Sequence, residues 1–219
     1  MARTLTEDIY DRLREDILTL RMKPGQKMSE AKLARHYSVS RAPIRNVIQK
    51  LQEEGLVLVK PQAGTIIMPI SLKKARDILD VRLQLEGYAA AKAVERITDE
   101  DIANLDRRFA ELDEPGLDPE ERARRMFAVD FFLHQTIWRL CGNDEIIRIL
   151  DTYRDLVQRI RRVTLELANR MVPSMEEMRE IFTALRARDA ERARAAIHQH
   201  IANISRSIAR IATADGEGA

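Results

Sequence analysis

The chain has 219 residues, of which 45% are hydrophobic and 33% charged, and its formal net charge is +2 at pH 7. This length allows two domains, and the composition is that of a water-soluble globular protein rather than of a disordered or fibrous chain. The single cysteine, Cys141, excludes an intramolecular disulfide, and no apolar run approaches the ~20 residues that cross a bilayer. We therefore expect a cytoplasmic protein without a membrane partner.

The N-terminal third of the chain predicts a helix-turn-helix. A first helix is expected over 6–20, where apolar residues recur at helical spacing. After the loop at 21–28, Ser29 can cap a short helix, and Ser40 can cap a second one that carries Pro43 in its first turn. Two such helices in succession are typical of this DNA-binding motif.

The second of these helices has the pattern of a DNA reader. Arg41 and Arg45 are four residues apart and share one face. The opposite face is an apolar stripe, formed by Ile44, Val47, Ile48 and Leu51. Arginine at the start of such a helix can pair with guanine edges or with phosphates. The alternative is a helical packing module in which both arginines are solvated surface charges.

Two strand-like runs follow the reader helix. Residues 56–60 read LVLVK and residues 65–70 read TIIMPI, with turn residues at 61–64 between them, which predicts a two-stranded wing. Residues 1–70 hold 12 Lys and Arg against 8 Asp and Glu, whereas the remainder holds 25 against 27. The positive excess therefore lies with the predicted reader, as a nucleic-acid partner requires.

A dense set of residues in this region follows the pattern of a known family. Its members are Ser29, Glu30, Leu33, Ala34, Val39, Ser40, Arg41, Pro43, Arg45, Leu51, Glu54, Gly55, Leu56 and the wing-tip Gly64. On these residues the region resembles the winged-helix regulators of the GntR family. The resemblance implies contacts to double-stranded operator DNA from Ser40, Arg41, Ala42, Pro43, Arg45 and Gly64. Many relatives have a basic residue in place of Ala31, so we expect one contact fewer here.

Downstream of a short linker marked by Pro69 and Ser71, the sequence predicts helix throughout. The expected helices cover 72–97, 99–112, 119–140, 144–170, 175–187 and 190–212, and Ser174 with Glu177 forms a capping box before the fifth. We therefore predict a mainly α protein. A winged helix-turn-helix at 1–70 precedes an all-helical antiparallel bundle at 71–213, and a disordered tail covers 214–219.

Five residues of the expected bundle form a second recognisable pattern. Arg82 and Glu86 lie four apart in the first bundle helix, Asp130 and His134 four apart in the third, and His200 in the last. On these residues the bundle resembles the effector domain of the FadR and FCD branch of the GntR family, and its six expected helices are similar to those of VanR-type members. The resemblance implies a divalent metal, zinc or nickel, at Asp130, His134 and His200, and an effector carboxylate clamped by Arg82.

Other interpretations of these residues stay open. Met178 aligns with a further histidine of the family, and a thioether is a poor ligand for zinc or nickel, so the ligand set is incomplete. Asp130 and His134 can also form a buried hydrogen-bonded pair without a metal. Arg82 can be a solvated charge or pair with Glu86 instead of clamping an effector.

The predicted function is that of a ligand-responsive transcriptional regulator and not of an enzyme. We expect a homodimeric repressor, because a two-fold protein matches a palindromic operator, and a small organic acid as the effector that releases it. The alternatives are a helical metal-dependent hydrolase, in which the metal activates water, and an interaction module without a ligand.

Overall fold

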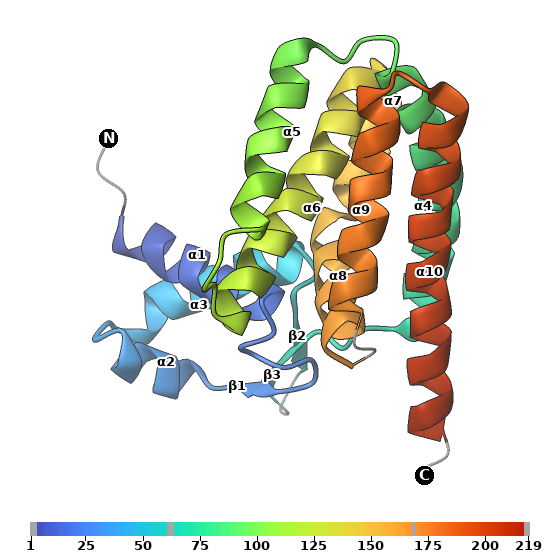
Figure 1. The fold of residues 1–219 in the computed structure, drawn as a ribbon. Helices are drawn as coiled ribbons and strands as arrows, with labels where there is room; N and C mark the ends of the chain where they lie inside the picture. Colours follow the sequence, from blue (N-terminus) through green and yellow to red (C-terminus); the bar gives the residue numbers. More distant parts are fainter. Residues whose placement is uncertain (1–3, 61–63, 168–169, 217–219) are drawn as a thin grey trace. The chain divides into compact units, whose positions relative to one another are not determined.

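The computed structural model describes residues 4–60, 64–167 and 170–216 (Figure 1). The chain forms two compact units. The first comprises Met1–Ser71 with Gln158–Arg162, and the second comprises Leu72–Val157 with Val163–Ala219. No helix in the described part of the chain has both the length and the apolar character that a membrane span needs.

The first unit contains three helices and three short strands among its described residues up to Ser71. The helices are α1 (Leu5–Leu18), α2 (Glu30–His36) and α3 (Arg41–Glu53), and the strands are β1 (Lys27–Met28), β2 (Val57–Lys60) and β3 (Gly64–Ile67). The Ser29 hydroxyl caps α2 by accepting a hydrogen bond from the backbone N–H of Lys32, as predicted. Ser40 occupies the N-cap position of α3 in extended conformation, but its side chain makes no capping hydrogen bond.

The strands form an antiparallel sheet in the order β1-β3-β2. The predicted wing corresponds to β2 and β3, which are in register from Val57 opposite Ile67 to Lys60 opposite Gly64. The prediction of two strands was wrong by one, because Lys27 and Met28 add β1 to the other edge of β3. A strand of two residues is too short to display an alternating pattern. The predicted turn residues 61–63 lie outside the described residues.

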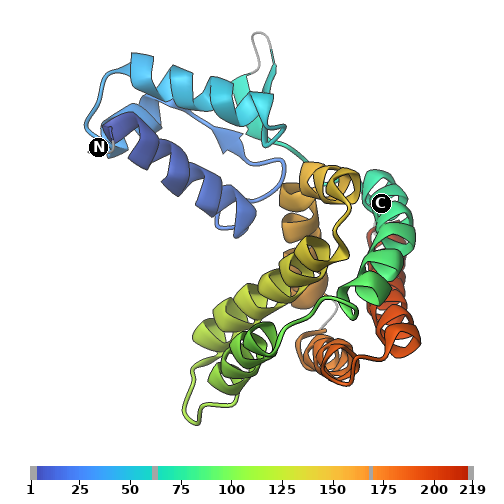
Figure 2. The ribbon, with the colours of Figure 1, turned by 90° about the horizontal axis from the view of Figure 1, so that it is seen from above.

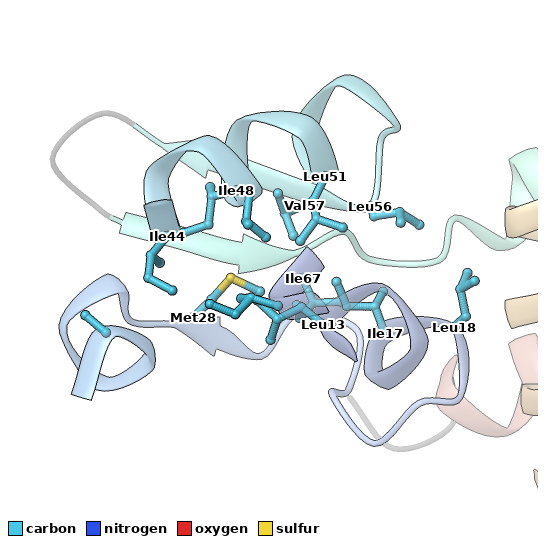
Figure 3. Close-up of a cluster of buried hydrophobic side chains, with 13 residues drawn as sticks. Leu13, Ile17, Leu18, Met28, Ile44, Ile48, Leu51, Leu56, Val57 and Ile67 are labelled. Carbon is cyan, nitrogen blue, oxygen red and sulfur yellow. The ribbon is translucent and has the colours of Figure 1, made fainter. Parts of the chain in front are cut away.

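One apolar core holds this unit together (Figure 3). The buried stripe of α3 faces the buried side chains of α1 and of the sheet, and the core is formed by Ile9, Leu13, Ile17, Leu18, Met28, Ala34, Ile44, Val47, Ile48, Leu51, Leu56, Val57 and Ile67. Because the core fixes the inward face of α3, the opposite face with its arginines is held toward solvent.

The second unit is entirely helical in its described residues, as predicted, but it contains seven helices and not six. They are α4 (Leu72–Ala93), α5 (Asp99–Leu112), α6 (Pro119–Cys141), α7 (Asp144–Thr152), α8 (Arg154–Leu167), α9 (Met171–Arg186) and α10 (Ala190–Gly216). The expected helix at 144–170 is interrupted at Tyr153, whose N–H bonds to carbonyls of the last turn of α7. No glycine or proline marks this break, so the sequence does not signal it.

Two further boundaries differ from the predicted ones. Helix α9 begins at Met171, so Pro173 lies in its first turn, where proline is tolerated, and Ser174 lies inside the helix. The predicted capping box of Ser174 and Glu177 is therefore wrong. Helix α10 continues to Gly216, past the expected boundary at 213, and the last three residues of the tail lie outside the described residues.

Helix α4 lies at the centre of the bundle contacts. It packs against α6 and α10, while α9 packs against α6 and α10 and α5 against α6. Helices α4 and α10 lie side by side in both views (Figures 1 and 2). Gly87 makes this approach possible, because a Cβ there would lie 2.0 Å from Nε2 of His198 on α10. The close packing brings the chemically active side chains of α4, α6 and α10 together.

Candidate functional site

The first candidate surface is the solvent face of α3. Arg41, Ala42 and Arg45 are exposed on it, whereas Pro43 is half-buried. Ser40, immediately before the helix, is also exposed. The structure therefore presents both arginines in the first turns of α3, at the helix end where backbone N–H groups favour phosphate.

An ion pair fixes one of these arginines. Nε of Arg45 lies 3.0 Å from Oε2 of Glu30 at the start of α2, so α2 and α3 are joined across the turn. The sequence analysis did not anticipate this pair, because the two residues are distant along the chain. It also left out Asn46 and Gln49, which are exposed on α3. The available signal was helical spacing, since Asn46 lies four residues after Ala42 and Gln49 four residues after Arg45.

Gly64 opens β3 at the described edge of the wing. Its φ is +90°, a conformation that L side chains rarely adopt. Gly64 is paired with Lys60 of β2, so the last basic residue before the turn lies beside it. The wing thus ends on a glycine and an exposed lysine, a pair of residues suited to close approach to a phosphate backbone.

The second candidate site lies inside the helical unit. Asp130 and His134 of α6 and His200 of α10 are all buried, and each offers a ligand atom that lies within 4.8 Å of the other two. Nε2 of His134 and Nε2 of His200 each lie 3.7 Å from the same carboxylate oxygen, Oδ1 of Asp130. The structure therefore brings together the three residues that the sequence analysis named as metal ligands.

Two carboxylates hold the opposite side of each imidazole. Oε2 of Glu86 lies 2.5 Å from Nδ1 of His134, and Oε2 of Glu177 lies 2.8 Å from Nδ1 of His200. A carboxylate on Nδ1 fixes the ring so that Nε2 is the ligand atom, as in many metal sites. Nε2 of His134 is buried without a hydrogen-bond partner among the described residues. The donor set and its geometry fit a divalent metal ion.

Both supporting carboxylates are held in the ionised form. Burial by itself raises the pKa of Glu86, but the charges and hydrogen bonds of Arg82 and His134 outweigh it and lower the pKa far below its usual value. Burial opposes ionisation of Glu177 as well, and the hydrogen bond to His200 is the main reason why its pKa is lowered. The site therefore keeps negative charge behind each histidine.

Arg82 belongs to the same cluster. It is buried, its Nε donates to Oε1 of Glu86, and its Nη2 lies 3.5 Å from Nδ1 of His134. The ion pair with Glu86 was one of the two interpretations of this arginine. Its Nη1 is buried and has no hydrogen-bond partner within the described part of the chain, so one donor is left over for a further group.

Glu177 is the site residue that the sequence analysis misassigned. Instead of capping α9, its carboxylate accepts hydrogen bonds from Arg170 at 2.6 Å and from Asn203 of α10 at 2.5 Å. The capping pattern of its neighbours concealed this role, since a carboxylate three residues after a serine satisfies it. The adjacent Met178, which aligns with the family histidine, is fully buried on α9.

Comparison with family profiles gives two matches that together cover most of the chain. Residues 5–67 match the "Bacterial regulatory proteins, gntR family", and residues 77–203 match the FCD domain. The two matched segments contain the α3 surface and the buried Asp130, His134 and His200 cluster, respectively.

Several curated proteins are similar over most of their length. The HTH-type transcriptional repressor RspR of Escherichia coli is 26% identical over 94% of this chain and 90% of its own. A regulator of Streptomyces ambofaciens described as an uncharacterized HTH-type transcriptional regulator in an unstable DNA locus is 29% identical over 96% and 87%. The Nta operon transcriptional regulator of Aminobacter aminovorans is 31% identical over 64% and 63%.

Solved structures share the fold. The structure of E. coli McbR/YncC covers 95% of this chain and 99% of its own, with a TM-score of 0.72 and 19% identity. A putative transcriptional regulator GntR from Rhodococcus sp. RHA1 covers 93% and 96%, with a TM-score of 0.71 and 18% identity.

Proposed function

Because the chain belongs to the GntR family of bacterial transcriptional regulators and carries the FCD domain, we propose that it binds operator DNA as a homodimer and releases it on binding an effector. The effector is a small organic acid, bound at a divalent metal ion in the helical domain. The observation that carries the effector part is the convergence of Asp130, His134 and His200 with a carboxylate on Nδ1 of each imidazole.

The DNA part rests on the solvent face of α3. One reader helix covers a half-site only, and a two-fold dimer on a palindromic operator doubles the number of contacts. Arg41 and Arg45 contact base edges or phosphates, and Ser40, Ala42 and Pro43 form the start of the same helix. Gly64 and the wing lie against the phosphate backbone.

The effector part rests on the buried cluster. Three protein ligands leave a coordination position open on a tetrahedral ion. When bound, zinc or nickel supplies a concentrated positive charge to which a carboxylate oxygen coordinates. Arg82 donates from Nη1 to the second carboxylate oxygen, since this buried nitrogen has no other acceptor in the described residues. Glu86 and Glu177 orient the histidines.

The regulatory step is a shift between two arrangements of the dimer. The effector stabilises the arrangement in which the spacing of the two reader helices no longer fits the operator. The change in DNA affinity can be no larger than the difference between the effector's affinities for the two arrangements. A tight operator complex therefore requires an effector with a large differential affinity.

Isothermal titration calorimetry with zinc chloride tests the metal site. The protein is first stripped with a chelator, and the wild type is compared with D130A, H134A and H200A. We expect one zinc per chain in the wild type and loss of this binding in each variant, while H36A, which removes an exposed histidine of α2, binds as the wild type does. Equal zinc binding in all variants would contradict the assignment of the ligands.

A further inference from the structure

A second hollow lies on α6, away from the histidine cluster. It has a volume of about 410 Å³ and is bounded by α6, α7 and the first residue of α8. Phe132, Gln135 and Arg139 line it, and their positions on α6 lie opposite Asp130 and His134. Its volume is in the range of small-molecule sites, roughly 300–1,000 Å³. We refer to it as the α6 groove.

Two buried donors at the α6 groove have no acceptor. Trp138 lines the groove with 6% of its surface exposed, and its Nε1 has no hydrogen-bond partner among the described residues. The same holds for Nε of Arg154, whose Nη2 is paired with Asp151 in the helical turn before it. Buried N–H groups in folded proteins nearly always have a partner, so the missing acceptors point to a bound molecule that supplies oxygens.

The walls of the α6 groove define the remainder of that molecule. Phe132 and Trp138 offer aromatic surface, which favours a flat ring. The acidic groups near the groove are already paired: Asp151 with Arg154, and Asp101 with Arg139 at 2.5 Å. The groove therefore offers donors and aromatic surface in excess of acceptors, which excludes a cationic ligand and favours an anionic one.

We propose that the α6 groove binds an aromatic carboxylate, separately from the effector at the histidine cluster. Its ring lies against Phe132 and Trp138, and its carboxylate accepts from Nε1 of Trp138 and from Arg154. The indole of Trp138 also contacts the imidazole of His134 edge-on, with ring centroids 6.3 Å apart. A ligand in the groove thus rests on a side chain that touches the histidine cluster from its other side.

The fluorescence of Trp138 reports directly on this groove, because it is the only tryptophan in the chain. Sodium benzoate is titrated into the full-length wild type and into a D130A/H200A variant, in which the histidine cluster is disabled. We expect a saturable change in emission in both proteins with similar Kd values. Benzyl alcohol, which keeps the ring and lacks the carboxylate, produces no saturable change. A response to benzoate that disappears in D130A/H200A would overturn the proposal, since the ligand would then occupy the cluster.

Two substitutions test the donors. R154M is expected to weaken benzoate binding by about tenfold, since it removes a charged hydrogen bond. R148M, at an exposed arginine of α7 paired with Glu145, is the matched control and leaves the Kd unchanged. W138F keeps the aromatic wall, and calorimetry is expected to show weaker binding even if R154M fails to fold. Wild-type affinity in W138F, or no saturable binding of benzoate to the wild type, would overturn the proposal.

Discussion

Nδ1 of His200 lies 2.8 Å from Oε2 of Glu177, so a carboxylate of α9 sets the orientation of an imidazole on α10. Glu86 of α4 does the same for His134 at 2.5 Å. Both rings are therefore turned with Nε2 toward Asp130. Supporting carboxylates of this kind raise the basicity of the ligand and fix its tautomer.

The Glu177 carboxylate is expected to influence metal affinity without being a ligand. E177Q should weaken zinc binding by about 10- to 100-fold, because the amide is a poorer partner for Nδ1–H of His200. E180Q is the matched control, since Glu180 lies on the same helix, is exposed and pairs with Arg192. Calorimetry on chelator-treated protein gives both affinities. Zinc binding in E177Q equal to that of the wild type would contradict the supporting role.

Glu86 should make the stability of the metal-free protein depend on acidic pH. Its pKa is lowered in the folded state, so its contribution is complete above the unfolded value of ~4.3 and is lost as pH falls toward the folded value. E86Q leaves Arg82 buried without its counter-charge and should cost about 3 kcal/mol of unfolding free energy at pH 7. Urea unfolding from pH 7 to 3 should show the gap between wild type and E86Q closing below pH ~5.

A matched carboxylate separates this effect from general acid unfolding. Glu95 is exposed and pairs with Lys92 at 2.8 Å, so E95Q should cost less than ~1 kcal/mol at any pH. A gap between wild type and E86Q that stays constant down to pH 3 would mean that the Glu86 ion pair does not titrate as described.

Met178 provides a test of the ligand set. If its position matches the family histidine, M178H adds a third imidazole and should raise zinc affinity well above that of the wild type, since imidazole suits zinc and a thioether does not. Without metal, a polar ring in this fully buried position should lower stability. V172H, at an exposed position of the same helix, is the control. No gain in zinc affinity in M178H would show that residue 178 does not reach the cluster.

Arg82 is expected to affect the effector response more than DNA binding. Mono- and dicarboxylates are first screened for thermal stabilisation of the wild type, and the best is then used to displace DNA from each variant. R82A should need far more of this compound, while its DNA affinity without the compound stays close to that of the wild type. R76A removes an exposed arginine of α4 and should behave as the wild type does. Loss of DNA binding in R82A with an unchanged effector response would contradict the role.

Much of the fold could be predicted from local signals in the sequence. Capping residues such as Ser29 and Asp118 mark helix starts, because their side chains accept hydrogen bonds from the free backbone N–H groups of the first turn. The break at Tyr153 and the strand β1 could not be predicted in this way. Neither has a turn residue or a repeating pattern, and tertiary contacts decide both.

The candidate site was predictable where its residues share one helix. Asp130 and His134 are four apart, and that spacing places both on one face of α6. The carboxylate of Glu177 was missed because its partners, Arg170, His200 and Asn203, are brought to it by the folding of α9 against α10. Sequence spacing carries no information about contacts of this type.

The most direct test of the account is sequence-specific DNA binding through α3. A preferred duplex is first selected from a random library with the wild type, and binding is then measured by fluorescence anisotropy. R41A and R45A should each lose ~1–3 kcal/mol of specific binding while remaining folded, and log affinity of the wild type should fall with log salt at about −0.9 per phosphate neutralised. R107A, at an exposed arginine of α5, should bind as the wild type does. Wild-type affinity in both α3 variants, or a flat salt dependence, would contradict the central claim that this surface reads operator DNA.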